Sequence, residues 1–126
     1  MNPQELRDRT KRLALDIVKA VRELPPNEAS RIIGRQVLRS ATSVAANYRA
    51  STRARSRREF IAKIGLVIEE MDETILWLEL LRDSEILPGN RLAALFDESD
   101  QLLRIFAATR RTSRAPNRKS QITNHK

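Results

Sequence analysis

The sequence predicts an all-α protein, an antiparallel up-down-up-down four-helix bundle. The composition favours helix, because only three of the 126 residues are glycine, 4% are aromatic, and Leu, Ala, Ile, Arg and Glu are abundant. Apolar residues also recur with helical spacing in four segments that breaker residues separate. A chain of this length forms one domain, and four helices joined by short connections pack best with each antiparallel to the next.

The first two helices have clear boundaries in the sequence. Residues 2–5, Asn-Pro-Gln-Glu, offer an N-cap side chain, a proline for the first turn and a glutamate three residues on, which predicts a helix over about 3–24. Pro25 and Pro26 end it, because proline interrupts the helical hydrogen-bond ladder. Asn27 or Ser30 can cap the second helix, which is predicted over about 28–53.

The third and fourth helices follow from equally local signals. Residues 56–59, Ser-Arg-Arg-Glu, form a capping box, and a heptad-like apolar stripe runs on from Phe60 to Leu81, which predicts a helix over about 57–84. Residues 87–90, Leu-Pro-Gly-Asn, break the chain, and Asn90 is predicted to cap a helix over about 90–112. The bundle therefore occupies residues 1–112, and residues 113–126 form a flexible basic tail without an apolar period.

Several classes of chemistry are not expected. The absence of cysteine fits a reducing cytoplasm and excludes thiol catalysis. The single histidine, His125, lies in the tail, and the sequence has no Gly-rich phosphate loop and no paired Glu-x-x-His motif for a di-iron site. No apolar run is long enough for a membrane span, and the N-terminus lacks the apolar stretch of a secretory signal. We expect a cytoplasmic, non-enzymatic protein without cofactor, metal ion or membrane contact.

Charge is distributed unevenly along the chain, whose net charge is +8. Residues 49–63 carry a net +5, residues 64–103 a net −8 and residues 104–126 a net +7. In the predicted topology the start of the first helix, the middle turn and the end of the fourth helix meet at one pole. Arginine pairs bidentately with phosphate, so this basic pole predicts salt-dependent binding of an RNA or DNA backbone. The candidate binding residues are Arg49, Arg53, Arg55, Arg57, Arg58, Arg110 and Arg111.

The same topology makes further assignments at both poles. The start of the first helix is expected to add its own bases to the basic pole, namely Arg7, Arg9, Lys11 and Arg12. The opposite pole is expected to be acidic and to collect Glu23, Glu28, Asp83, Glu85, Asp97 and Glu98. Two alternatives to nucleic acid remain open for the arginines, a merely soluble basic turn and a patch that docks an acidic protein surface.

Other polar residues are interpreted as structural. If the second and third helices pair about a turn near residues 54–55, Arg39 faces Glu69 and Glu70, and Arg35 faces Glu73. Interhelical ion pairs are then favoured over a cation site built from these acids and Asp72. Ser43 and Asn47 lie among small side chains, which favours helix packing or a subunit contact over a ligand pocket, and Tyr48 and Trp77 are favoured as core residues over base-stacking platforms.

One stretch also resembles a known family. Residues 34–60, GRQVLRS followed by ATSVAANYRASTRARSRREF, are similar to the signature of the bacterial four-helix bundle proteins related to those encoded in intervening sequences of 23S rRNA genes. Residues 61–81, IAKIGLVIEEMDETILWLELL, resemble that family's third helix. The similarity continues more weakly from about Leu13 to Thr112. Many members carry Glu-Gly shortly after the Asn, whereas this chain has Ala50 and Ser51 there, so no role of that glutamate is carried over.

The resemblance implies a fold, an assembly and partners. The family's fold is a four-helix bundle that assembles as a ring, typically a homopentamer, with no known enzymatic activity. More distant relatives are accessory proteins of diversity-generating retroelements, which are basic pentamers that bind a reverse transcriptase and nucleic acid. Two functions are therefore expected: an oligomer that binds nucleic acid, or a protein-interaction scaffold that docks a partner such as a reverse transcriptase.

Overall fold

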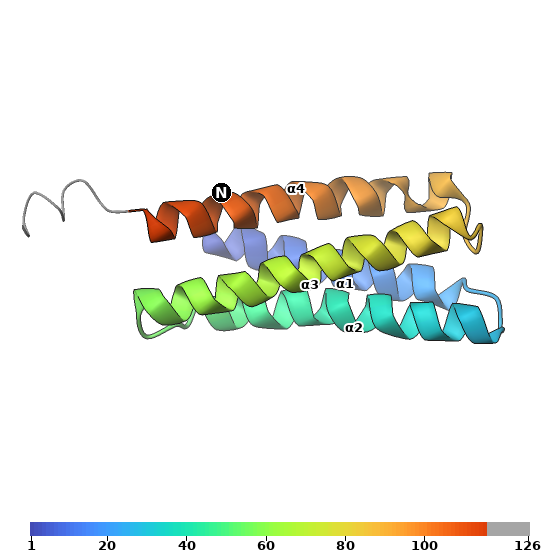
Figure 1. The fold of residues 1–126 in the computed structure, drawn as a ribbon, viewed down its shortest axis with the longest axis horizontal. Helices are drawn as coiled ribbons and strands as arrows, with labels where there is room; N and C mark the ends of the chain where they lie inside the picture. Colours follow the sequence, from blue (N-terminus) through green and yellow to red (C-terminus); the bar gives the residue numbers. More distant parts are fainter. Residues whose placement is uncertain (116–126) are drawn as a thin grey trace, which may run out of the picture.

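The computed structural model describes residues 1–115, and they form four antiparallel helices (Figure 1). The helices are α1 (Pro3–Arg22), α2 (Glu28–Ser51), α3 (Arg57–Asp83) and α4 (Gly89–Arg114). Each packs against the next along the chain, and α1 and α4 close the bundle with the fewest contacts. The start of α1, the α2–α3 connection and the end of α4 therefore lie toward one pole, as the sequence predicts, and the other two connections form the far pole.

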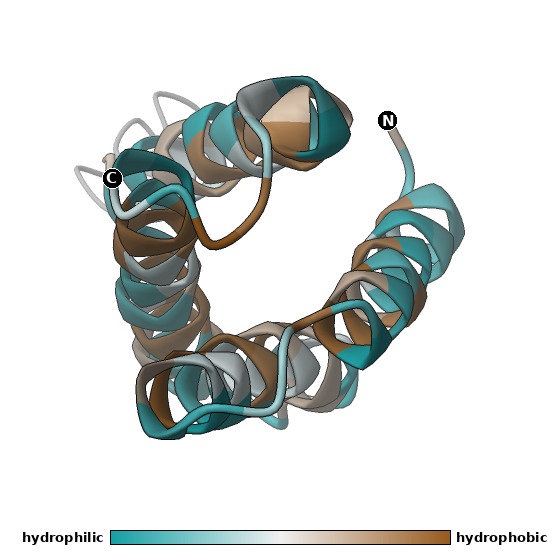
Figure 2. Cartoon of the chain, turned by 90° about the vertical axis from the view of Figure 1, so that its right-hand side faces the viewer, coloured by the Kyte–Doolittle hydropathy of each residue, from teal (hydrophilic) through white to brown (hydrophobic). Residues whose placement is uncertain are grey.

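Apolar residues of all four helices form the core, and the hydrophobic stretches of the ribbon lie largely toward the inside of the bundle (Figure 2). The view from the far pole shows one helix at each corner of a square, with hydrophobic residues toward the centre. The largest fully buried side chains come from all four helices: Leu13, Ile17, Val37, Val44, Ile64, Val67, Met71, Leu78, Leu81, Leu92, Leu102 and Phe106. Burial of these groups supplies most of the stabilisation of the bundle.

Side-chain caps start three of the helices where the sequence predicts. The Oδ1 of Asn2 accepts a hydrogen bond from the Glu5 amide, and Asn27, rather than Ser30, caps α2 in the same way. The Ser56 hydroxyl accepts from the Glu59 amide at the start of α3. These bonds satisfy amides that have no partner in the first turn of a helix.

The first three helices end one or two residues before the predicted positions, at Arg22, Ser51 and Asp83, and both ends of the fourth helix also differ. The predicted cap of the fourth helix, Asn90, is wrong: α4 begins at Gly89 with Pro88 in the N-cap position and no side-chain cap. The helix ends at Arg114, two residues beyond the expected end. Its last turn is polar, so the apolar period that predicted the helix does not extend over it. The tail predicted from residue 113 thus begins as helix, and residues 116–126, including His125, lie outside the described part of the chain.

The end of α3 is a Schellman motif built without glycine. Glu85 adopts a positive φ of 62°, its amide donates to the Arg82 carbonyl, and the Ile86 amide donates to the Leu81 carbonyl. Glycine usually occupies this left-handed position, because a side chain there is strained. Because position 85 is glutamate, no glycine marks this turn in the sequence.

A polar pair inside the core joins α2 to α3. The Thr74 hydroxyl lies 2.8 Å from Ser40 Oγ, and both side chains are fully buried. Thr74 Oγ1 also bonds to the Glu70 carbonyl, and Ser40 Oγ to the Val37 carbonyl. Because each hydroxyl also has a carbonyl partner on its own helix, the contact between them adds a polar link across the α2–α3 interface that favours this register.

Candidate nucleic-acid interface

The basic pole comprises charged side chains from α1, α2, the α2–α3 connection, the start of α3 and α4. They are Arg7, Lys11, Arg49, Arg53, Arg55, Arg57, Arg58, Arg110, Arg111 and Arg114. The acids nearest to them along the chain are Glu5, Asp8 and Glu59, and each serves local structure. Glu5 bonds to Asn2, Asp8 accepts from Gln4, and Glu59 accepts from the Arg55 amide. Positive charge therefore predominates at this end of the molecule.

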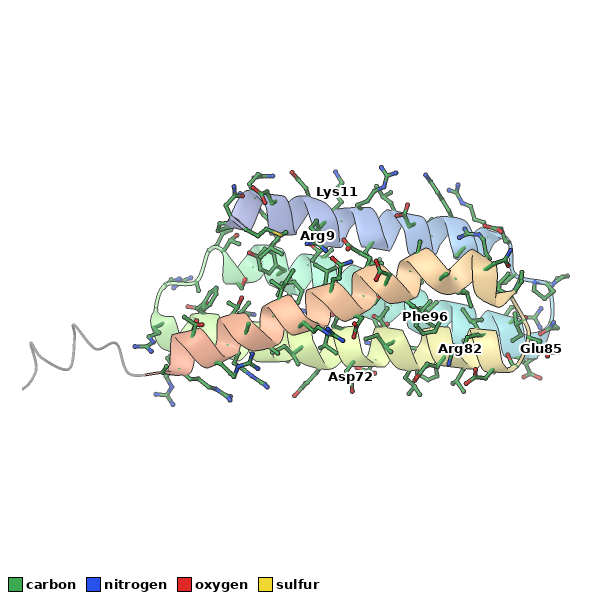
Figure 3. All side chains as sticks on the ribbon, turned by 90° about the horizontal axis from the view of Figure 1, so that it is seen from above. Arg9, Lys11, Asp72, Arg82, Glu85 and Phe96 are labelled. Carbon is green, nitrogen blue, oxygen red and sulfur yellow. The ribbon has the colours of Figure 1, made fainter. Side chains whose placement is uncertain are left out.

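A groove of about 480 Å³ runs between α1 and α2 at this pole. We call it the α1–α2 groove, and its lining consists of Arg7, Lys11, Thr42, Ala45, Ala46, Arg49, Ala50 and Arg53. The lining contains no acid. Within residues 1–115, the side chains of Lys11, Arg49 and Arg53 form no ion pair, so their charges face the groove uncompensated. Lys11 points outward from α1 in Figure 3.

Helical periodicity builds this groove. On α2, Thr42, Ala45, Ala46, Arg49 and Ala50 repeat at three- and four-residue intervals and so share one stripe. The alanines form the floor of the groove because their side chains are only methyl groups, and the longer arginine and lysine side chains form its walls. On α1, Arg7 and Lys11 are four residues apart and form the opposite wall. This stripe was visible in the sequence, but Arg7 and Lys11 were absent from the candidate binding residues because they lie far from the arginine cluster along the chain.

A second cavity, of about 630 Å³, opens beside the groove and shares Arg7 with it. We call it the end pocket. Its lining comes from the starts of α1 and α3, the end of α2, the α2–α3 connection and α4, and consists of Met1, Pro3, Leu6, Arg7, Tyr48, Ser51, Thr52, Ala54, Ser56, Arg57, Phe60 and Thr109. The pocket combines aromatic and aliphatic surface with hydroxyl groups and two arginines, a composition typical of ligand sites.

Tyr48 occupies the inner side of the end pocket. Its ring is 4% exposed and packs against Phe106 with a centroid distance of 5.3 Å, which agrees with the interpretation of Tyr48 as a core residue. Its hydroxyl forms no hydrogen bond with the described residues. Burial raises the pKa of this phenol, and the nearby positive charge of Arg7 opposes the shift only in part. Tyr48 therefore keeps its proton at neutral pH and can donate it.

Two arginines at the pole are already engaged by neutral oxygen atoms. Arg57 donates from Nε to the Ser113 carbonyl and from Nη2 to the Ala115 carbonyl at 2.8 Å, so it holds the last turn of α4 against the start of α3. Arg7 donates to Thr52 Oγ1 at 3.4 Å and to Gln4. Because neither contact neutralises the arginine, both side chains keep their full charge.

The remaining predicted bases lie at the same pole outside the two cavities. Arg55 and Arg58 are exposed at the α2–α3 connection, and Arg110 and Arg111 lie on the last turns of α4. Of the seven arginines predicted for binding, Arg49 and Arg53 line the α1–α2 groove and Arg57 lines the end pocket.

The far pole is not the acidic end that the sequence predicts. Arg91 binds both carboxylate oxygens of Glu23, and Arg82 binds Asp83 while stacking over the ring of Phe96 at 4.7 Å (Figure 3). The arginine holds the pKa of Glu23 below its usual range. Two of the acids assigned to this pole are thus paired with arginines, Glu23 across the α1–α4 interface and Asp83 on its own helix.

Arg9 and Glu98 are also placed differently from the prediction. Arg9 lies between Arg7 and Lys11 on α1, but its charge is compensated by Glu98 of α4 (Figure 3). The two side chains form a two-point ion pair, with Arg9 Nε 2.9 Å from Glu98 Oε2. This bond raises the pKa of Arg9. Arg12 is likewise occupied, by Asp16 on its own helix. Alternation of charge along the sequence could not reveal these pairs, because they depend on the rotation of each helix.

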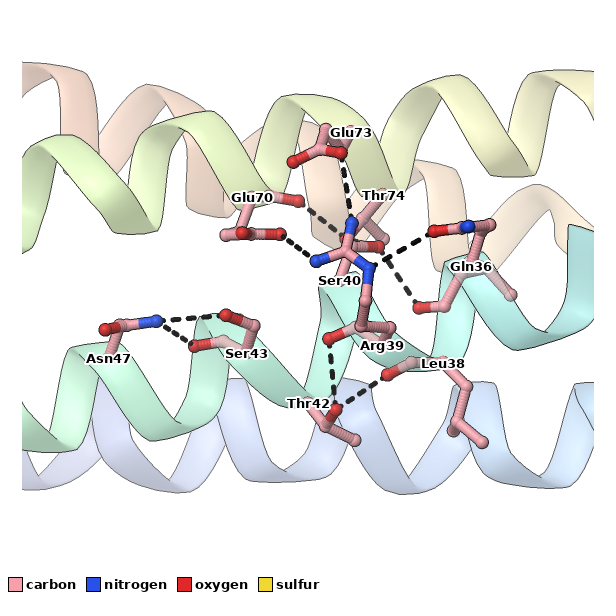
Figure 4. Close-up of polar contacts among 11 residues, drawn as sticks. Gln36, Leu38, Arg39, Ser40, Thr42, Ser43, Asn47, Glu70, Glu73 and Thr74 are labelled. Atoms are coloured by element: carbon pink, nitrogen blue, oxygen red, sulfur yellow. Dashed lines mark hydrogen bonds and ion pairs between the residues drawn. The ribbon is translucent and has the colours of Figure 1, made fainter.

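On the outer side of α2 and α3, Arg39 bridges two glutamates (Figure 4). Its Nη1 lies 3.3 Å from Glu70 and its Nη2 lies 3.0 Å from Glu73. The approach to Glu70 was predicted, whereas the pairing of Glu73 with Arg35 is wrong, because the long Arg39 side chain reaches both carboxylates, which lie one turn apart. Burial and the charge of Glu73 raise the pKa of Glu70 more than Arg39 lowers it. Glu69, the other predicted partner, is exposed and forms no ion pair with the described residues.

Ser43 and Asn47 hydrogen-bond to each other and line neither of the two cavities at the basic pole. The Asn47 amide donates to the Ser43 carbonyl and hydroxyl, both at 3.0 Å, so the two polar side chains satisfy one another along α2 (Figure 4). Trp77 is partly buried and packs against the core. Among residues 1–115 no group of three or more His, Cys, Asp or Glu side chains comes together as a metal site would require. No described helix has a stretch long and apolar enough to cross a membrane.

Comparisons with known proteins agree with the fold. The chain is similar over 88% of its length to a protein of unknown function from the S23 ribosomal protein family of Bacteroides thetaiotaomicron, whose crystal structure was determined at 1.70 Å resolution. The identity is 28%, the TM-score is 0.81, and 99% of that chain is covered. None of the curated proteins matches the chain. Residues 4–108 match the family described as 23S rRNA-intervening sequence protein, and the chain therefore belongs to this family.

Proposed function

We propose that this protein binds the phosphate backbone of nucleic acid through its basic pole. The α1–α2 groove carries the proposal, because Arg7, Lys11, Arg49 and Arg53 surround a floor of small residues and no acid lies among them. A row of cations along a groove suits a polyanion with regularly spaced charges, and arginine binds phosphate with two parallel hydrogen bonds. Such contacts supply affinity without reading the base sequence, so both RNA and DNA are ligands for this way of binding the backbone.

The role proposed is binding rather than catalysis. The linings of the groove and of the end pocket contain bases, hydroxyl groups and apolar side chains but neither histidine nor carboxylate. Proton transfer at neutral pH usually requires one of these groups, so the pole is suited to holding an anion in place.

A salt titration of binding tests the proposal. Fluorescence polarisation with labelled RNA and DNA oligonucleotides should give affinities that fall steeply as salt concentration rises. The double variant Arg49→Glu/Arg53→Glu should lower the affinity about 100-fold at low salt and reduce the slope of log K against log salt by about two. The control is Arg31→Glu/Arg35→Glu, which changes the same charge at the same spacing on α2 near the far pole. Absence of binding at low salt, or equal losses in both double variants, contradicts the proposal.

The protein is further proposed to act as a homo-oligomer. Leu66, Leu76 and Leu80 of α3 and Ile32 of α2 are 39–52% exposed. Ile32 precedes Arg39 by seven residues and Leu80 follows Glu73 by seven, so in this antiparallel pair they face one another as Arg39 and Glu73 do. A row of large apolar side chains on one face favours association with another protein surface. Cyclic symmetry, as in the pentamer that the family resemblance implies, would align the basic poles on one face and add their fields.

Mass measurement in solution tests the assembly. Leu76→Glu should shift the protein toward the monomer, because it places a charge within the proposed contact. Leu15→Glu changes a residue of nearly the same exposure on α1, 46% against 47%, and should leave the mass unchanged. If the wild type is a monomer, the same leucines favour the second candidate function, a scaffold that docks a different protein such as a reverse transcriptase, and a pull-down that Leu76→Glu abolishes would support it.

A further inference from the structure

The end pocket lies where a nucleic-acid strand held in the α1–α2 groove would continue. Arg7 lines both cavities, so a phosphate bound by Arg7 lies at the entrance of the pocket. The strand's sugar and base would then face the pocket, whose volume of about 630 Å³ falls within the range of small-molecule sites. The two cavities are thus arranged for adjacent parts of one nucleotide.

The pocket surface suits a heterocyclic base. Phe60 is partly buried and contributes aromatic surface, and Leu6 and Tyr48 extend the apolar lining. Every nucleobase has a flat π-face, and stacking on an aromatic side chain does not depend on sequence. Apolar surface of this kind gains nothing from a phosphate, which would prefer the groove.

The polar groups of the pocket suit the edge of the same base. The Tyr48 hydroxyl has no partner among the described residues, and burial keeps its proton in place. Ser56 Oγ accepts from the Glu59 amide and keeps its own proton for donation. Ser51 and Thr109 donate to backbone carbonyls and keep lone pairs that can accept. The pocket lining therefore offers both donors and acceptors, which matches the mixed edge of a base.

We propose that the end pocket binds one unstacked base of a single-stranded nucleic acid whose backbone lies in the α1–α2 groove. This inference rests on the proposed function and adds a preference to it. In a duplex each base is stacked and paired, so it enters the pocket only after these interactions are broken, whereas a single strand offers its bases freely. The protein should thus discriminate single strands from duplexes without reading their sequence.

Binding to four probes of equal length tests the inference on the full-length protein. The probes are single-stranded RNA, single-stranded DNA, a DNA strand of abasic sites and a blunt duplex, each followed by fluorescence polarisation at one salt concentration. Wild-type protein should bind the single strands about 10-fold more tightly than the abasic strand, the amount expected for one stacked base. The duplex offers phosphates but no free base, so Phe60→Leu should leave its affinity unchanged while lowering the affinity for the single strands.

Two variants locate the effect in the pocket. Phe60→Leu keeps an apolar side chain against the core and should bring the preference for bases over the abasic strand close to one. Tyr48→Phe removes only the hydroxyl and should reduce that preference about 3-fold. The matched control is Phe96→Leu, which makes the same change in a partly buried phenylalanine of α4 on the other side of the molecule from the pocket and should leave the preference intact.

The outcomes separate this inference from the proposed function. Salt-dependent binding in which wild type treats the abasic strand and the single strands alike, or in which Phe60→Leu and Tyr48→Phe both keep the preference, overturns the pocket and leaves the groove. Failure to bind any of the four probes overturns both. If Phe60→Leu does not fold, as judged by circular dichroism, Tyr48→Phe decides the question by itself.

Discussion

At the far pole arginines bind carboxylates, Arg91 to Glu23 and Arg82 to Asp83, whereas at the basic pole Arg57 binds only neutral carbonyl oxygens. At the far pole Arg91 joins the start of α4 to the end of α1, and Arg82 pairs with Asp83 on its own helix, so part of the charge there is compensated. The basic pole gathers like charges whose repulsion opposes folding. Compact helix ends do not require this arrangement, and the excess charge is what the proposed binding of a nucleic-acid backbone would use.

Glu98 provides the test with the largest expected effect on stability, because its ion pair with Arg9 is partly buried and joins α1 to α4. Glu98→Ala leaves the partly buried Arg9 unpaired and should lower the free energy of unfolding by about 1–2 kcal/mol, measured by urea denaturation. Asp100→Ala removes the exposed pair with Arg104 on the same helix and should cost at most about 0.5 kcal/mol. Equal losses would show that Arg9 is no better compensated than the surface bases.

Within the basic pole, Arg57 and Arg58 allow an arginine with a structural role to be compared with one that has no partner among the described residues. Arg57→Ala removes two hydrogen bonds to the end of α4 and should lower stability by about 1 kcal/mol. Arg58→Ala removes an exposed charge without a partner among the described residues, so its effect should be within about 0.5 kcal/mol and can be favourable through reduced repulsion. Thermal denaturation of both variants checks this, and a larger loss for Arg58 would contradict the assignment.

A substitution to glycine just beyond the end of α3 and a substitution of glycine inside α3 compare the backbone at these two places. Glu85→Gly at the far pole relieves a left-handed residue, and Gly65→Ala nearer the basic pole adds a methyl group that meets nothing within 4 Å in the interior of a helix. Each should raise the free energy of unfolding by about 0.5–1 kcal/mol, for opposite reasons. Denaturant titration of the single and double variants should show additive gains, and a loss for Glu85→Gly would show that its backbone is not strained.

The smallest expected effect concerns pH at the far pole. Arg91 lowers the pKa of Glu23 in the folded protein, so the ion pair contributes stability at neutral pH that is lost as pH falls from the ordinary glutamate range through the lowered pKa. Glu23→Gln should flatten this part of the stability profile. Melting temperatures measured from pH 7 to pH 3 check the difference, and identical profiles for wild type and variant would contradict the pairing.

Local sequence signals determined the elements of this protein. The caps at Asn2, Asn27 and Ser56 act over three residues, and the apolar periods need only the geometry of one helix, so both could be read along the chain. The end of α3 was predicted to within one residue, but the left-handed turn at Glu85 was not, because glycine is the usual signal at that position. The start of α4 was misplaced because Pro88 begins the helix without a side-chain bond.

The candidate interface was predictable only in part. The cluster from Arg49 to Arg58 and the order of the helices were sufficient to place a basic pole, because an antiparallel bundle brings alternate helix ends together. Which of those arginines face a cavity was not predictable. The predicted pairing of Arg35 with Glu73 was also wrong. A linear pairing rule ignores the reach of the long Arg39 side chain, which binds Glu73 instead.

The sequence by itself determined that this chain folds as four helices, belongs to its family and carries its excess bases at one end. Only the tertiary structure decided which charges are compensated, that Arg7 joins the α1–α2 groove to the end pocket, and that Glu98 lies against Arg9. The physical reason is that helix formation depends on neighbours within about one turn, whereas grooves and ion pairs depend on the rotation and offset of helices that lie far apart in the sequence.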